Sequence, residues 1–189
     1  MKITLASASP RRRELLSSLG FELKIMPSSA EEELLTGLSP EETVRHIALL
    51  KARDVARSAD VFPVVAADTL VYLDGRPLGK PRGEQDAKSM LRALSGRSHH
   101  VASGVAVISG ARELSSSETT EVFFRELSER EIDWYVKTGE PMDKAGAYGI
   151  QGLGSVFIER IDGDFFNVMG LPLCRLCLML RELGYDMIG

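Results

Sequence analysis

A continuous apolar run that leads directly into an acid constrains the fold more than any other feature of this chain. Residues 64–67 read Val-Val-Ala-Ala, and Asp68 and Thr69 follow at once. An unbroken apolar run of this length is typical of a strand that is covered on both faces. Open α/β sheets place their chemistry at the carboxyl ends of such strands, so we predict that this strand ends at Asp68 and presents a functional carboxylate. The alternative is an acid that only begins a turn.

The composition is that of a folded and mildly acidic protein. Of the 189 residues 44% are hydrophobic, the formal net charge is -4 and the isoelectric point is about 5.5, so we expect a sizeable core and no nucleic-acid partner. No apolar run approaches the roughly 20 residues that span a bilayer, which predicts no membrane partner. The polar start of the chain and its two cysteines indicate neither an export signal nor a disulfide framework. We therefore expect one cytoplasmic domain over residues 1–189.

Hydrophobic periodicity and turn residues predict alternating helices and strands. Helices are expected over residues 10–19, 40–57, 84–94, 129–137 and from 172 onwards. Strands are expected over 3–6, 21–26, 64–67, 100–109, 121–124 and 156–161, with a hairpin over 70–80 that turns at Asp74 and Gly75. The residues between 109 and 121 are polar and predict a connection. Alternating elements of this kind indicate an α/β fold with some antiparallel pairing.

Two predicted helices carry cations on faces that are otherwise apolar. In the first helix an inward stripe is formed by Leu15, Leu16 and Leu19. Arg12 lies on this stripe, and three consecutive arginines oppose the positive end of the helix dipole. An anion bound at that helix start would explain them, with hydroxyl donors from Ser7 and Ser9. In the long helix Lys51 falls at the centre of an apolar face, so its ammonium must reach a cleft, a carboxylate or a phosphate. A solvated basic surface and a structural ion pair are the respective alternatives.

Further candidate groups lie in loops. Glu31, Glu32 and Glu33 form a run of acids, any one of which could join Asp68 as an oxygen ligand for Mg2+ or Mn2+. Lys80 could reach a phosphate, although residues 75–81 do not have the spacing of a P-loop. The glycine-rich segment 149–154 offers backbone amides and the Gln151 amide, whose paired donor and acceptor can read a base edge.

Together these side chains suit one reaction. Cations would neutralise a polyphosphate, while acids would hold a metal and deprotonate water, and no nucleophilic serine motif is present. We therefore predict metal-assisted hydrolysis of a polyphosphate, with Asp68 as the general base.

Short segments of the chain also resemble the Maf family of nucleoside triphosphate pyrophosphatases, nearly end to end and in the same order. They are LASASPRRRELL (5–16), KAR (51–53), AADTLV (66–71), LGKP (78–81), LSGRSHHV (94–101), DKAGAYGIQG (143–152) and GLPL (170–173). The resemblance implies cleavage between the α and β phosphates to a nucleoside monophosphate and pyrophosphate, a divalent cation, a cytoplasmic location and a homodimer. The fold implied is a mixed twisted sheet flanked by helices, with a central cleft, like that of the inosine-triphosphate pyrophosphatases.

The resemblance also assigns roles to residues. It implies that Asp68 is the catalytic acid and that Glu32, with Asp68, is a metal ligand. The phosphate-handling positions that it implies are Ser7, Arg11, Arg12, Lys51 and Lys80. Arg12, Thr69 and Gln151 resemble the branch that hydrolyses dTTP and UTP, whereas the sister branch, which prefers 7-methyl-GTP, has a glutamate in place of Gln151.

Other functions stay open on the sequence. The protein could belong to the 7-methyl-GTP branch, or it could bind nucleotides without cleaving them as a regulator of cell division, a role with which the family's name is associated. A general phosphatase is a third alternative, and release of orthophosphate instead of pyrophosphate would distinguish it.

Overall fold

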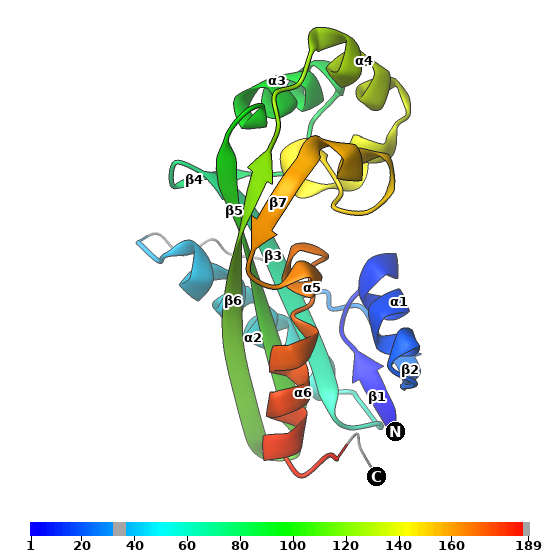
Figure 1. Cartoon of the computed structure of the whole chain (residues 1–189). Coiled ribbons are helices and arrows are strands. Elements are labelled where there is room, and N and C mark those ends of the chain that lie inside the picture. Colours follow the sequence, from blue (N-terminus) through cyan, green and yellow to red (C-terminus); the bar gives the residue numbers. More distant parts are fainter. Residues whose placement is uncertain (32–36, 187–189) are drawn as a thin grey trace. The chain divides into compact units, whose positions relative to one another are not determined.

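The structure is a computed structural model that describes residues 1–31 and 37–186 (Figure 1). The chain divides into two compact units: unit 1 comprises residues 1–69, 102–118 and 170–189, and unit 2 comprises residues 70–101 and 119–169. Three strands, β3 (Val64–Leu73), β5 (Ser98–Ser109) and β6 (Arg112–Phe124), contain a unit boundary and continue through it.

The strands form a mixed sheet. In the described residues it has seven strands in the order β2-β1-β3-β5-β6-β7, with β4 paired to β3. The shorter strands are β1 (Lys2–Leu5), β2 (Glu22–Ile25), β4 (Arg76–Leu78) and β7 (Ile158–Asp162). β1 pairs in parallel with β2 and β3, whereas β4 on β3 and β7 on β6 are antiparallel. The predicted mixed α/β sheet is confirmed.

Unit 1 buries the strands between helices. Helix α2 (Pro40–Ala56) packs Ala48, Ala52 and Val55 against Val64 and Ala66 of β3 and against Ala106 and Ile108 of β5. The approach is closest at Gly104, where a Cβ would lie 2.1 Å from the carbonyl oxygen of Val44. Helices α1 (Pro10–Ser18) and α6 (Leu173–Glu182) complete the unit, and α6 lies in front of the strands in Figure 1.

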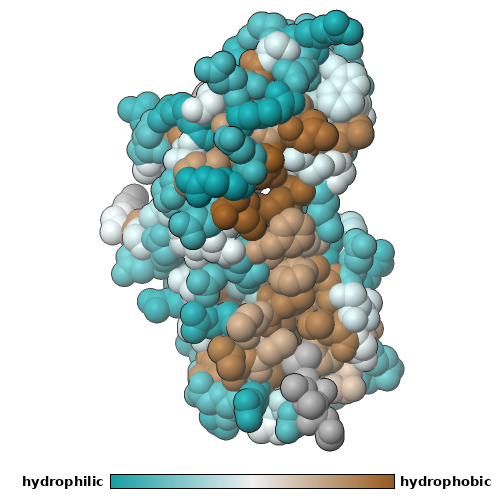
Figure 2. All heavy atoms as spheres, in the orientation of Figure 1, coloured by the Kyte–Doolittle hydropathy of each residue, from teal (hydrophilic) through white to brown (hydrophobic). Residues whose placement is uncertain are grey.

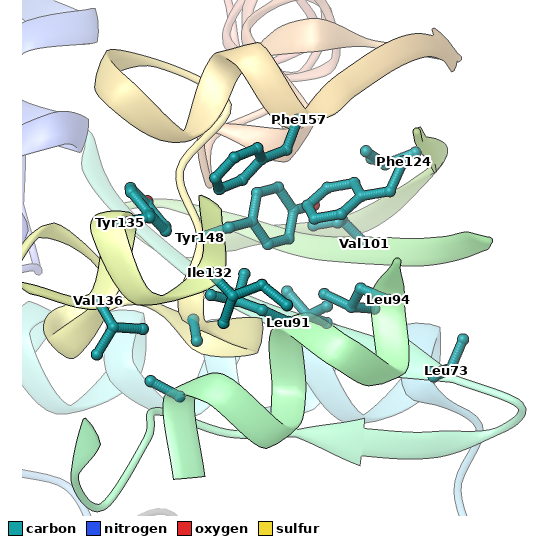
Figure 3. Close-up of a cluster of buried hydrophobic side chains, with 14 residues drawn as sticks. Leu73, Leu91, Leu94, Val101, Phe124, Ile132, Tyr135, Val136, Tyr148 and Phe157 are labelled. Atoms are coloured by element: carbon teal, nitrogen blue, oxygen red, sulfur yellow. The ribbon is translucent and has the colours of Figure 1, made fainter. Parts of the chain in front are cut away.

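Unit 2 is built around aromatic side chains that meet edge to face. Tyr148 packs against Phe124, and Phe157 packs against Tyr135 (Figure 3). The ring of His99 contacts both Tyr148 and Phe124. Helices α3 (Glu84–Leu94) and α4 (Glu129–Lys137) contribute aliphatic side chains to the same cluster. The remaining segments are α5 (Phe165–Val168) and the 3-10 helices η1 (Glu140–Asp143), η2 (Ala145–Ala147) and η3 (Gly152–Phe157).

Local sequence signals for helix starts are confirmed. Ser9 accepts a hydrogen bond from the backbone N–H of Arg12 at the start of α1, with Pro10 as the first helical residue. Capping boxes open α2 at Ser39 and α4 at Ser128. The hairpin between β3 and β4 turns at Asp74 and Gly75, both with positive φ.

Four predictions were wrong in detail. β3 does not end at Asp68 but runs on to Leu73, because the hairpin with β4 extends it. β6 begins at Arg112 instead of residue 121, since its polar first half lacks the apolar alternation by which strands are recognised. β7 begins at Ile158, after the 3-10 helix η3. Leu19, expected on the inward stripe of the first helix, is 38% exposed because α1 ends at Ser18.

Candidate active site

Asp68 and Lys51 form an ion pair on the sheet of unit 1. The Nζ atom of Lys51 lies 2.7 Å from Oδ1 of Asp68, and the two side chains are only 16% and 17% exposed. Asp68 follows the four buried residues of β3, just past Val64 and Val65, which pair with β1. Lys51 comes from the buried face of α2, between Ala48 and Val55. The lysine that interrupts an apolar face therefore reaches the acid that follows an apolar strand.

Close packing of α2 on the sheet sets this distance. Because Gly104 has no side chain, the backbone of α2 at Val44 can contact β5 directly. Lys51 follows Val44 by two helical turns on the same face, so the helix must lie this close for the ammonium to meet Asp68.

Arg12 ties together segments from the start, the middle and the end of the chain. Its Nε donates to the carbonyl of Gly170 at 2.9 Å, and its Nη1 donates to the carbonyl of Ala67 at 2.8 Å and to Oγ of Ser7 at 3.2 Å. Its Nη2 donates to Oγ1 of Thr69 at 3.1 Å. The guanidinium therefore fixes the backbone on the amino-terminal side of Asp68 and a hydroxyl on its carboxyl-terminal side.

Hydroxyl groups extend this network. Oγ1 of Thr69 lies 2.9 Å from Oγ of Ser103, whose side chain is fully buried on β5. A Cβ at Gly170, where φ is +101°, would lie 3.1 Å from Oγ1 of Thr69, so this position requires a glycine. Ser7, 9% exposed, accepts the backbone N–H of Ser9 at 3.2 Å and so shapes the turn before α1. Arg11 lies half-buried on the first turn of the same helix.

Two predicted site residues belong to unit 2. Lys80 is exposed just after β4, and Gln151 is exposed at the start of η3, in the glycine-rich segment 149–154. Glu32 lies outside the described residues. Within unit 1, then, the structure brings Asp68 together with Lys51, and it brings Arg12 together with Ser7 and Thr69.

A divalent cation is compatible with the donor set. Among residues 1–31 and 37–186, no group of three or more His, Cys, Asp or Glu side chains could hold a metal ion. Mg2+ in nucleotide sites is commonly held by one or two carboxylates and the substrate phosphates, and so it does not need a cage made of protein. Asp68 fits this kind of site, because its carboxylate is a hard oxygen ligand and the ammonium of Lys51 beside it can bind a phosphate.

Several residues that shape the site carried no signal in the sequence. Nothing in the sequence distinguishes Ser103 from the other serines. It joins the site only through its hydrogen bond with Thr69 on the neighbouring strand. Glu140 binds the backbone of the glycine-rich segment in unit 2, although it precedes that segment by several residues. Gly104 could be found only from the contacts that a side chain would make there.

Comparison with known proteins identifies the family. Residues 2–183 match the family model described as Maf-like protein. This chain belongs to the Maf family. The segments that resemble Maf motifs contain Asp68, Lys51 and Arg12, the residues that the structure gathers in unit 1.

Relatives with names match over almost their full length. A protein named dTTP/UTP pyrophosphatase from Caldicellulosiruptor bescii is 49% identical over 193 residues, covering 99% of this chain and 97% of that protein. Proteins of the same name from Bacillus pumilus and Pyrococcus furiosus are 47% and 46% identical, covering 97% and 98% of this chain and 97% of each relative.

Solved structures support the fold. A HAM1 protein from Coxiella burnetii superposes with a TM-score of 0.54 at 20% identity, covering 96% of this chain and 99% of that one. The Ham1 protein of Staphylococcus aureus gives a TM-score of 0.52 at 16% identity, covering 84% and 80%. At these identities the likeness concerns the fold alone, and it confirms the predicted fold class.

Proposed function

We propose that this protein is a nucleoside triphosphate pyrophosphatase that hydrolyses dTTP and UTP to the nucleoside monophosphate and pyrophosphate. The observation that carries the proposal is the Lys51–Asp68 ion pair of unit 1. The carboxylate of Asp68 is largely shielded from solvent and lies 2.7 Å from the ammonium of Lys51. The name dTTP/UTP pyrophosphatase, given to relatives that match nearly full length, supports the choice of nucleotides.

In this proposal Asp68 is the general base. Its carboxylate accepts a proton from water as the water oxygen attacks the α phosphorus. The bond between that phosphorus and the oxygen that bridges to the β phosphorus breaks, and pyrophosphate leaves with the electron pair of this bond. A general base of this kind contributes about 10² to 10⁴ in rate.

Other side chains bind and orient the triphosphate. The ammonium of Lys51 lies beside the carboxylate of Asp68. A phosphate oxygen bound by Lys51 would therefore lie close to the general base. Arg11 and Lys80 supply further cations, and Ser7 supplies a hydroxyl donor. Arg12 is predicted to bind substrate, and its four hydrogen bonds also give it a supporting part, because they hold Ser7 and Thr69 in place.

A divalent cation, Mg2+ or Mn2+, belongs to the proposal. Asp68 would hold it together with the substrate phosphates, and Glu32 is the proposed second protein ligand. When bound, the cation would supply positive charge to the phosphates. We propose that Gln151 recognises the base, because an amide can both donate a hydrogen bond to the edge of uracil or thymine and accept one from it.

We also propose a cytoplasmic homodimer. Leu178 of α6 is 53% exposed, and Figure 2 shows apolar surface over this helix, which supports association with a second copy. Cys174 and Cys177 are free thiols, as is usual in a reducing compartment. Among the described residues, no helix combines the length and the apolar character that crossing a membrane requires.

The direct test is a substrate panel. Purified protein is incubated with dTTP, UTP, 7-methyl-GTP and the common triphosphates in the presence of Mn2+, and pyrophosphate and orthophosphate are measured separately. We expect pyrophosphate from dTTP and UTP, and loss of turnover when a chelator removes the metal. Preference for 7-methyl-GTP, release of orthophosphate, or binding without turnover would each contradict the proposal.

A further inference from the structure

The glycine-rich segment of unit 2 is held on both sides of Gln151 by two side chains. The backbone N–H of Gly149 donates to the hydroxyl of Tyr135 at 3.2 Å. The N–H groups of Leu153 and Gly154 donate to the two carboxylate oxygens of Glu140 at 3.0 and 3.1 Å. Gln151 thus lies on a short arch whose two ends are fixed.

The two anchoring side chains are also bonded to each other. The hydroxyl of Tyr135 donates to Oε1 of Glu140 at 3.0 Å. The ring of Tyr135 packs edge to face on Phe157, with the ring centroids 5.1 Å apart, inside the aromatic cluster of Figure 3. The anchor therefore has a fixed orientation, set by the core of unit 2.

Glycine is required where the arch passes the anchor. A Cβ at Gly152, where φ is +75°, would lie 2.9 Å from Oε2 of Glu140. A Cβ at Gly154 would lie 2.6 Å from the hydroxyl oxygen of Tyr135. The backbone is therefore wrapped tightly around the carboxylate and the phenol, and small shifts of either would move the arch.

Both anchoring groups hold the protonation states that these bonds need. Burial and the hydrogen bond to Glu140 raise the pKa of Tyr135, so the phenol stays protonated and donates. Burial acts to raise the pKa of Glu140, but the N–H groups of Leu153 and Gly154 and the Tyr135 hydroxyl outweigh it and hold that pKa below its ordinary value. At neutral pH the carboxylate is ionised and accepts from all three donors.

We propose that Glu140 is a positioning residue for nucleotide selection: its carboxylate, together with Tyr135, holds the arch 149–154 in the arrangement that presents the Gln151 amide to the base. This proposal rests on the proposed function, in which Gln151 reads the base. Glu140 itself touches no reacting atom in this account. It acts only through the residue that it positions.

The test compares Glu140→Gln with wild type in steady-state hydrolysis of dTTP. The substituted amide keeps the size of the side chain, but one of its two terminal atoms becomes a donor and can no longer accept an N–H. We expect KM for dTTP to rise about tenfold while kcat stays within about twofold of wild type. Competitive inhibition by inorganic tripolyphosphate, which has no base, should be unchanged.

A double-mutant cycle with Gln151→Ala separates positioning from simple stabilisation. If Glu140 acts through Gln151, KM of the double variant should equal that of Gln151→Ala alone. An independent second increase would overturn the proposal, and so would weaker tripolyphosphate inhibition by Glu140→Gln. Tyr135→Phe, which loses the acceptor for Gly149, should give a smaller rise in KM and serves as the second variant if Glu140→Gln does not fold.

The matched control is Glu131→Gln. Glu131 accepts the N–H of Ser128 in a capping box and pairs with Arg125 at 2.6 Å, so its loss lowers stability without touching the arch. We expect a lower Tm and an unchanged KM. If Gln151→Ala leaves KM for dTTP unchanged, base reading by Gln151 fails. If Gln151→Ala raises KM and Glu140→Gln does not, only the positioning proposal fails.

Discussion

In unit 1 the polar side chains of the candidate site project from regular elements, whereas in unit 2 Gln151, the proposed base-binding residue, lies on an arch held by a half-buried carboxylate. Lys51 and Asp68 are placed by a helix face and a strand, and both lie next to fully buried alanines. Gln151 depends on Glu140 and Tyr135 for the path of its backbone. The difference shows that rigid packing positions the groups proposed for the chemistry, while hydrogen bonds to backbone amides position the group proposed for selection.

Removing the acid of unit 1 should have the largest effect. Asp68→Asn keeps the shape of the side chain but cannot accept a proton from water, so kcat for dTTP should fall by about 10² or more. Stopped assays of pyrophosphate release measure this. Asp133→Asn is the control, because Asp133 also pairs with a lysine, Lys88, at 2.6 Å but lies in unit 2. Near wild-type turnover of Asp68→Asn would show that another acid is the base.

Acid should weaken the aromatic core that supports the arch of unit 2. Burial, with a smaller contribution from the neighbouring charge of His100, lowers the pKa of His99 from 6.5 to about 4. Between about pH 6.5 and pH 4, His99 is therefore protonated in the unfolded chain but not in the folded chain. The free energy of unfolding falls as the pH drops through this range. The integrated loss at this site is about 3 kcal/mol.

Urea unfolding at pH 7 and pH 5 measures the part of this loss that falls between those two pH values, about 2 kcal/mol. His99 also lies 2.7 Å from the hydroxyl of Tyr148, which immediately precedes the arch, so His99→Gln keeps a polar partner there while removing the titration. We expect His99→Gln to reduce the pH slope and His46→Gln, on an exposed site of α2, to leave it as in wild type. Equal slopes in all three proteins would contradict the prediction.

The close approach of α2 should be the feature of unit 1 most sensitive to a small change. Gly104→Ala would put a Cβ 2.1 Å from the carbonyl oxygen of Val44, so the helix must shift. We expect a loss of about 2 kcal/mol in the free energy of unfolding and a lower kcat, because Lys51 moves with the helix. Gly83→Ala, where a Cβ meets open space at the N-cap of α3, is the control and should lose no more than about 1 kcal/mol. Unchanged stability of Gly104→Ala would refute the packing argument.

Removing the lysine of unit 1 should have the smallest effect on rate. Lys51→Ala should raise KM for dTTP about tenfold, most strongly at high salt, where nonspecific attraction no longer compensates. Lys88→Ala removes a lysine with the same 16% exposure and a carboxylate partner, and it should leave KM unchanged. Equal losses of stability in both variants with no change in KM would make Lys51 a purely structural partner of Asp68.

The same contrast explains what the sequence could reveal. A lysine on an apolar helix face and an acid after an apolar run are visible in one dimension, because helices and strands have fixed periods. The Arg12 network is not, since Arg12 and Gly170 lie 158 residues apart and meet only in the folded chain. Glu140 was missed for a related reason: two of its three donors are backbone N–H groups, which every residue except proline has. The polar half of β6 was missed because its residues do not alternate between apolar and polar.

One measurement tests whether Asp68 serves the chemistry and Gln151 serves base selection. It is kcat/KM for dTTP and for 7-methyl-GTP in wild type, Asp68→Asn and Gln151→Ala, with pyrophosphate release as the assay. We predict that Asp68→Asn lowers both values by the same factor and leaves their ratio unchanged, whereas Gln151→Ala lowers the value for dTTP alone. A ratio that changes with Asp68→Asn and not with Gln151→Ala would contradict the account.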